Sequence, residues 1–185
     1  MRSIALLLAA FVVPLSALAA DPKPDDMVND PPFANWSMFA PGTSVTQKET
    51  VTLPDGSKLE MTKTQKLVAK SADKVTVEMT IATHGDALEE STVTTTTYPA
   101  KVKMSEVNSP PDVTSVTEGK EAVDLKGKKV DAEWYEAVTK LGPEVTTDKS
   151  WTARDVPGGI IKETIVRKRG DEVLSESLLE VVDWK

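Results

Sequence analysis

The stretch KVTVEMTI, residues 74–81, decides the fold class, because apolar and polar side chains alternate along it without a break. An alternation with a period of two is the pattern of a β-strand that has one buried and one hydrated face. The apolar positions of this stretch are Val75, Val77, Met79 and Ile81. The stretch therefore predicts an antiparallel sheet with one apolar side.

The segments before and after this strand repeat its pattern and are separated by turn sequences. Pro-Asp-Gly at 54–56, Lys-Gly-Lys at 126–128 and Arg-Gly-Asp at 169–171 suit tight turns, because glycine accepts a positive φ. After residue 20, no segment of ten or more residues repeats apolar positions at helical spacing. Roughly nine sequential strands predict a mainly β fold with few or no helices: one strongly curved antiparallel meander sheet, either a half-barrel or an open barrel. A flat two-sheet sandwich is the alternative.

The sequence Val-Pro-Gly-Gly at 156–159 raises the question of a functional loop. A phosphate-binding loop needs a following Lys-Ser or Lys-Thr and a helix, whereas Ile-Ile-Lys-Glu-Thr-Ile-Val follows here. A nucleophile elbow needs a serine between glycines, and this motif has none. Pro157 and Gly158 instead suit the second and third positions of a type II turn. We therefore predict a hairpin corner.

The first twenty residues have the features of a signal peptide. Arg2 supplies the positive start, residues 4–18 are almost wholly apolar, and Ala17-Leu18-Ala19 fits the cleavage pattern. This predicts a periplasmic or secreted protein with no stable membrane insertion after cleavage. The chain has no cysteine and hence no lipid anchor of the bacterial lipoprotein kind. Residues 21–35, rich in Pro and Asp, predict an extended, poorly ordered leader, and residues 36–185 a single β domain.

An aromatic cluster lies where the predicted leader meets the domain. It consists of Phe33, Trp36, Met38 and Phe39. We expect these side chains to plug one end of the core, and a ligand-binding patch is the alternative.

Charge and composition exclude several functional classes. The chain has 22 basic and 29 acidic residues, a net charge of −7. Without Arg2 it becomes −7 − 1 = −8. This balance disfavours nucleic acid and anionic membrane surfaces, which are polyanions. One histidine, His84, and no cysteine cannot supply a usual zinc site. The leader acids lack EF-hand spacing. We predict no metal, no cofactor and no catalytic residue.

Two stretches resemble a known group of proteins. NWSMFAPGTSV at 35–45 and EAVDLKGKKVDAEWYEAVT at 121–139 with SWTARDVPGGIIKET at 150–164 are similar to small secreted proteins of planctomycete-type bacteria. The likeness covers most of residues 36–168, but its motifs are turns and core aromatics and imply no catalytic residues. More distantly, the chain resembles the LolA-like periplasmic lipoprotein-carrier half-barrels, which hold acyl chains in a concave face under helices.

The sequence favours a non-enzymatic binding protein that holds an apolar or amphipathic ligand, such as a lipid, on a concave sheet face. This idea requires a cavity of about 300 Å³ or more. Candidate lining residues, chosen by face, are Val77, Met79, Ile81, Trp134, Glu136, Ile161 and Ile165. Glu136 shares the predicted buried side of its strand, with a salt bridge at the sheet rim as the alternative. A structural or protein-interaction domain of the bacterial envelope, using strand edges or the threonine-rich strand at 92–97, is the second hypothesis.

Overall fold

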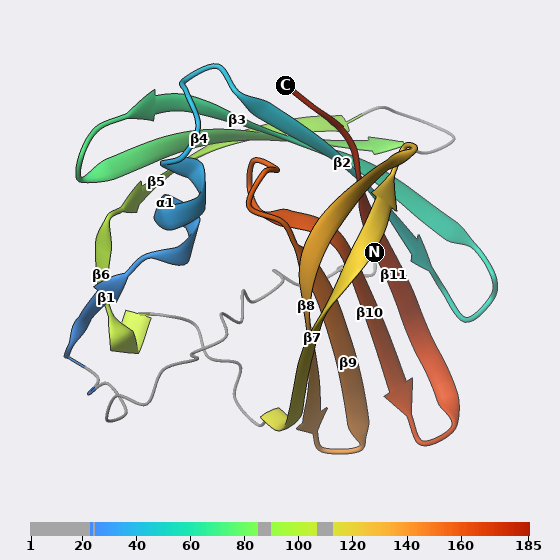
Figure 1. The fold of residues 1–185 in the computed structure, drawn as a ribbon. Coiled ribbons are helices and arrows are strands. Elements are labelled where there is room, and N and C mark those ends of the chain that lie inside the picture. Colours follow the sequence, from blue (N-terminus) through green and yellow to red (C-terminus); the bar gives the residue numbers. More distant parts are fainter. Residues whose placement is uncertain (1–22, 24, 85–89, 107–112) are drawn as a thin grey trace.

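A computed structural model describes residues 23, 25–84, 90–106 and 113–185. The predicted signal peptide, residues 1–20, lies outside the described residues. The main element is a nine-stranded antiparallel sheet that curves around a hollow (Figure 1). In chain order its strands are β2 (Ser44–Thr52), β3 (Lys58–Lys70), β4 (Lys74–His84), β5 (Glu90–Pro99), β7 (Val113–Leu125), β8 (Lys128–Leu141), β9 (Glu144–Thr152), β10 (Ile160–Arg169) and β11 (Glu172–Trp184).

The strand order is β5-β4-β3-β2-β11-β10-β9-β8-β7. Two meanders are thus joined where the first and last strands of the sheet, β2 and β11, pair with each other. The edges are β5 and β7, which follow each other along the chain but do not pair, so the sheet stays open. The prediction of a mainly β, strongly curved antiparallel sheet is confirmed. A single uninterrupted meander was a simplification, because the chain leaves the sheet between β5 and β7.

The segment before β2 differs from the predicted poorly ordered leader. Residues Met27–Asn29 form β1, which pairs with β6 (Lys101–Lys103), and Pro31–Trp36 form the short helix α1. A 3-10 turn, η1 (Met104–Glu106), follows β6. Pro31 and Pro32 suggested an extended chain. Proline is also tolerated at the first positions of a helix, because backbone N–H groups there have no partner within the helix. The burial of Trp36 then fixes the helix in place.

We call the side of the sheet on which α1 lies the concave face. Side chains of directly opposed cross-strand partners point to the same side of a sheet. One row across this face runs Met61–Glu49–Leu179–Glu163–Ser150–Tyr135 from β3 to β8. The next row runs Val51–Ser177–Ile165–Asp148–Ala137 from β2 to β8. α1 and the β9–β10 loop lie over the other end of the same face (Figure 1).

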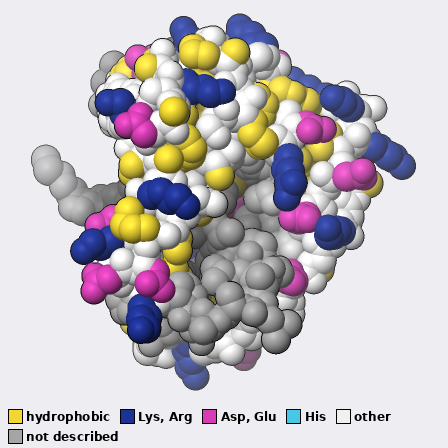
Figure 2. Space-filling view, turned by 60° about the vertical axis from the view of Figure 1, so that its left-hand side comes forward, with side chains coloured by type: hydrophobic (Ala, Val, Ile, Leu, Met, Phe, Trp, Pro, Cys, Tyr) yellow, Lys and Arg dark blue, Asp and Glu magenta, His cyan; other side chains and the backbone are white. Residues whose placement is uncertain are grey.

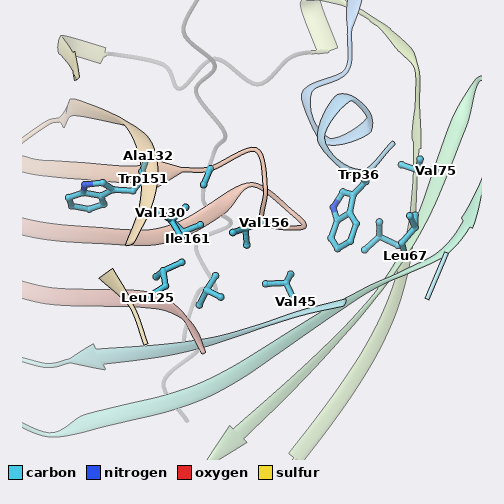
Figure 3. Close-up of a cluster of buried hydrophobic side chains, with 13 residues drawn as sticks. Trp36, Val45, Leu67, Val75, Leu125, Val130, Ala132, Trp151, Val156 and Ile161 are labelled. Carbon is cyan, nitrogen blue, oxygen red and sulfur yellow. The ribbon is translucent and has the colours of Figure 1, made fainter. Parts of the chain in front are cut away.

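The hydrophobic core continues from one half of the sheet to the other. Trp36 lies beside Leu67 and Val75, while a second group around Trp151 and Ile161 lies on the far side (Figure 3). Val45 and Val156 lie between the two groups (Figure 3). Trp36 is 2% exposed, so the prediction that this part of the aromatic cluster plugs the core is supported.

The Val-Pro-Gly-Gly sequence forms the predicted corner between β9 and β10. The N–H of Gly159 donates to the carbonyl of Val156 over 3.0 Å, and Gly158 has φ of +79°, which are features of a type II turn. Val156 is fully buried. A Cβ on Gly158 would lie 3.5 Å from the Trp36 ring. The corner therefore packs inside the curved sheet against α1, in addition to joining two strands.

Candidate functional site

A cleft of about 1480 Å³ lies between α1 and the β7–β8 hairpin. One wall comes from the α1 segment and includes Pro31, Ala34 and Met38. The opposite wall is formed by β7 and β8, and Ser150 and residues 152–156 close the inner side. The volume exceeds the roughly 300 Å³ that a small-molecule site requires.

The cleft combines apolar surfaces with separated charges. Met38, Val156 and Trp184 belong to its lining, and Lys128 Nζ lies 5.7 Å from the Trp184 ring centre. Lys120 and Glu133 form an ion pair of 2.8 Å on the hairpin wall. Basic and acidic side chains are interspersed over the face shown in Figure 2, without a broad area of one sign. Such a lining suits an amphipathic molecule better than a polyanion.

Trp134 is held on the hairpin by its neighbours. Its ring lies over Gly119 of β7, where an added Cβ would approach the ring to 2.7 Å, so a side chain at this position would displace the tryptophan. Lys149 Nζ lies 4.1 Å from the centre of the same ring and 4.8 Å from that of Trp151. The Trp151 indole donates to the Glu121 carboxylate. This stack of tryptophans and lysine fixes the shape of the wall.

The structure brings together only some of the predicted site residues. Val77, Met79, Ile81 and Ile165 project from the concave face. Ile161 is fully buried in the core. Trp134 and Glu136 lie on the opposite side of the sheet, because they oppose Trp151 and Lys149, whereas Tyr135 and Ala137 share the rows of Glu163 and Asp148. Of the seven residues, Trp134 belongs to the described lining of the cleft.

The length of β8 explains the misplacement of Trp134 and Glu136. Val130 and Ala132, near the start of the strand, are buried, as is Ala137 nearer its end. The first two residues and Ala137 point to opposite sides, because the strand period is two. A 14-residue strand thus buries different faces at its two ends as the sheet curves. One alternation pattern for the whole strand could not represent this change.

Sequence reasoning missed two carboxyl groups on the concave face, Glu163 and Asp148. Glu163 is 7% exposed. Burial raises its pKa to about 7, the nearby Asp148 and Glu49 add to this rise, and Lys63 opposes it. Burial also raises the pKa of Asp148 to about 6. In the sequence, Glu163 lies between Ile161 and Ile165 on the apolar side of its strand. This position was the signal that could have predicted a buried carboxyl group.

The neighbouring carboxylate Glu49 has an ion-pair partner, although its Oε2 atom, like Oδ1 of Asp148, has no hydrogen-bond partner among the described residues. Lys63 Nζ lies 2.5 Å from Glu49 Oε2, and the Ser177 hydroxyl donates to Glu49 Oε1 over 2.9 Å. Asp148 Oδ1 is buried and has no hydrogen-bond partner within the described chain. In this part of the concave face, carboxyl groups therefore outnumber the cations that neutralise them.

The carboxyl groups adjoin the cleft. Ser150 belongs to the cleft lining, and it is the cross-strand partner of both Tyr135 and Glu163. Directly opposed side chains lie about 5 Å apart. Glu163 itself lies outside the described cleft lining, one cross-strand position from Ser150.

The described residues offer neither a metal-binding cluster nor a membrane-spanning helix. No group of three or more histidine, cysteine or acidic residues in the described ranges is arranged to hold a metal ion. No helix within the same ranges is long and apolar enough to cross a membrane. His84, the unique histidine, has a side chain outside the described part, so its predicted lack of a catalytic role stays a prediction.

Comparison with known proteins gives distant structural similarity. No family model matches the chain, and no curated protein matches it. An S-type phycobiliprotein lyase from Guillardia theta aligns with 79% of this chain and 89% of its own, at 14% identity and a TM-score of 0.33. A LolA-superfamily protein from Nitrosomonas europaea aligns over 78% and 86%, at 8% identity and a TM-score of 0.24. The second of these proteins belongs to the superfamily that the sequence distantly resembles.

Proposed function

We propose that the protein is an exported, non-enzymatic binding protein that holds an apolar or amphipathic small molecule, such as a lipid, inside its curved sheet. The cleft of about 1480 Å³ between α1 and the β7–β8 hairpin is the observation that carries the proposal. The apolar side chains Ala34, Met38 and Trp184 provide contact area there, and burial of apolar ligand surface contributes about 25 cal/mol per Å².

A substitution at Ala34 tests whether the cleft binds ligand. Ala34 is exposed and lies in the cleft wall, so Ala34→Trp should fill space without disturbing the core. Titration with the fluorescent probe N-phenyl-1-naphthylamine should give saturable binding at one site per wild-type chain. We expect Ala34→Trp to weaken this binding at least about tenfold, since a bulky side chain competes with the probe for the pocket.

Ala40→Trp is the matched control, because Ala40 is also exposed but lies outside the described cleft lining. It should bind the probe like the wild type. Equal weakening by both substitutions, or a wild type without saturable binding, contradicts the proposal.

A protein-interaction role is the second candidate, and the edge strand β5 favours it. Every residue from Ser91 to Thr97 is exposed, and this segment contains no charged side chain. Exposed edge strands with unpaired backbone groups are templates for another strand, and charges usually block them. A partner that adds a strand to β5 would account for its threonine-rich sequence.

A further inference from the structure

The geometry points to a cationic ligand: we propose that the molecule held in the cleft carries a protonated amine, which Glu163 and Asp148 receive at the inner end of the site. This inference rests on the proposed binding function and adds the chemical class of the ligand. It is carried by the position of the two carboxyl groups, by the burial of Glu163 and by Asp148 Oδ1, which has no hydrogen-bond partner among the described residues.

The two carboxyl groups are placed to share one cation. Glu163 of β10 opposes Ser150 of β9, and Asp148 lies two residues before Ser150 on the same side of β9. Glu163 and Asp148 are therefore diagonal neighbours, which places their Cα atoms about 7–8 Å apart and lets their side chains approach a common point. An ammonium group has three N–H donors, so it can donate hydrogen bonds to both carboxylates at once.

Two cations of this face, Lys63 and Arg167, are already engaged. Lys63 is paired with Glu49, and Arg167, which shares the face, is paired with Glu144 over 2.9 Å. Lys63 offsets only part of the effect that burial and the neighbouring acids have on the pKa of Glu163. Asp148 Oδ1, like Glu49 Oε2, has no hydrogen-bond partner among the described residues. Burying carboxyl groups without partners costs free energy, and an incoming cation would offset this cost.

The surroundings of the carboxyl groups suit an amine attached to an apolar body. Leu179 flanks Glu163 in the adjacent strand, and Ile165 flanks Asp148 in the same way. A path to the cleft leads over Ser150, which belongs to the cleft lining. An alkyl chain could thus lie in the cleft while its ammonium group contacts the carboxylates. A metal ion suits the site less, because the described residues contain no group of three ligands arranged for one.

Binding should depend on pH in a defined direction. The charged groups facing Glu163 are Asp148, Lys63 and Glu49, while Ser177 and Leu179 of β11 are uncharged. Because the pKa values of Glu163 and Asp148 are raised to about 7 and about 6, the free site holds protons at pH 5. A cation favours the ionised carboxylates. Its affinity should therefore rise from pH 5 to pH 8, with release of protons on binding.

Three probes with the same alkyl chain test this proposal. Dodecylamine, dodecanol and dodecanoate are compared at pH 8 by displacement of N-phenyl-1-naphthylamine from the full protein, below their micelle concentrations. We expect dodecylamine to bind at least about tenfold more tightly than dodecanol, and dodecanoate to bind most weakly. The dodecylamine advantage should shrink at least about fivefold at pH 5, where the carboxyl groups are protonated.

Isosteric variants identify the residues responsible. Glu163→Gln and Asp148→Asn should each reduce the preference for dodecylamine over dodecanol, and the double variant should abolish it. Glu180→Gln is the control, because Glu180 is exposed on the other face and pairs with Lys162 over 3.4 Å. Circular dichroism and probe binding establish that each variant is folded.

The outcomes separate the inference from the function on which it rests. Equal displacement by all three probes, or a preference unchanged in the double variant, overturns the cationic-ligand inference and leaves the binding function standing. If the wild type binds neither the alkyl probes nor the fluorescent probe, the binding function and the cationic-ligand inference are both overturned.

Discussion

Replacement of Trp36 by alanine is expected to lower the free energy of unfolding by about 3–5 kcal/mol, the cost of removing a large buried aromatic side chain. Trp36 is 2% exposed and belongs to the core with Leu67 and Val75 (Figure 3). It also contacts the β9–β10 corner, where the nearest ring atom lies 3.5 Å from a Cβ position built on Gly158. Loss of the ring therefore removes the contact that holds α1 and this corner together.

Urea unfolding of the wild type, Trp36→Ala and Met38→Ala measures this effect. Met38 lies two residues further on but is 55% exposed, so its substitution should change the free energy by less than about 0.5 kcal/mol. A Trp36→Ala variant as stable as Met38→Ala would show that α1 does not close the core.

Replacement of Glu163 by glutamine is expected to stabilise the protein at pH 8 by about 3 kcal/mol. In the unfolded chain this carboxyl ionises near its ordinary pKa of 4.5, whereas burial raises the folded-state pKa to about 7. Between these values the folded state binds more protons, so the free energy of unfolding falls as the pH rises. One pKa unit corresponds to about 1.4 kcal/mol, which sets the size of the effect.

Thermal or urea unfolding from pH 4 to pH 8 tests the linkage. The wild type should lose stability between about pH 4.5 and pH 7, and Glu163→Gln should lose less. The pH dependence of stability that remains in Glu163→Gln should come partly from Asp148. Burial raises the pKa of this residue to about 6. Identical pH profiles for the wild type and Glu163→Gln would contradict the assignment of a buried carboxyl group with a raised pKa.

The fold was predictable because strand alternation and turn chemistry are local signals. The predicted strand is β4, in which Val75 and Val77 are buried, and the Val-Pro-Gly-Gly corner has the predicted turn. The pairing of β2 with β11 was not predictable, since it joins strands more than a hundred residues apart. The helix α1 was missed because six residues carry no helical periodicity and its position depends on the burial of Trp36.

The candidate site was less predictable than the fold. A strand pattern distinguishes two faces, and it placed Val77, Met79 and Ile81 together. The pattern could not show that the buried face of β8 changes along the strand. For this reason Trp134 and Glu136 lie on the side of the sheet opposite to the concave face. Nor could the pattern show that Glu163 and Asp148 lie close together without a paired cation, because such a relation depends on the register of β9 with β10.

Native mass spectrometry of the protein purified from its native source, followed by solvent extraction, tests the binding function most directly. We predict a bound small molecule in stoichiometric amount whose extract contains an apolar or amphipathic compound. Ala34→Trp produced in the same source should lack it, because the added ring occupies the cleft wall. A wild-type protein that is free of ligand and does not bind N-phenyl-1-naphthylamine would contradict the account and turn the search to a protein partner at β5.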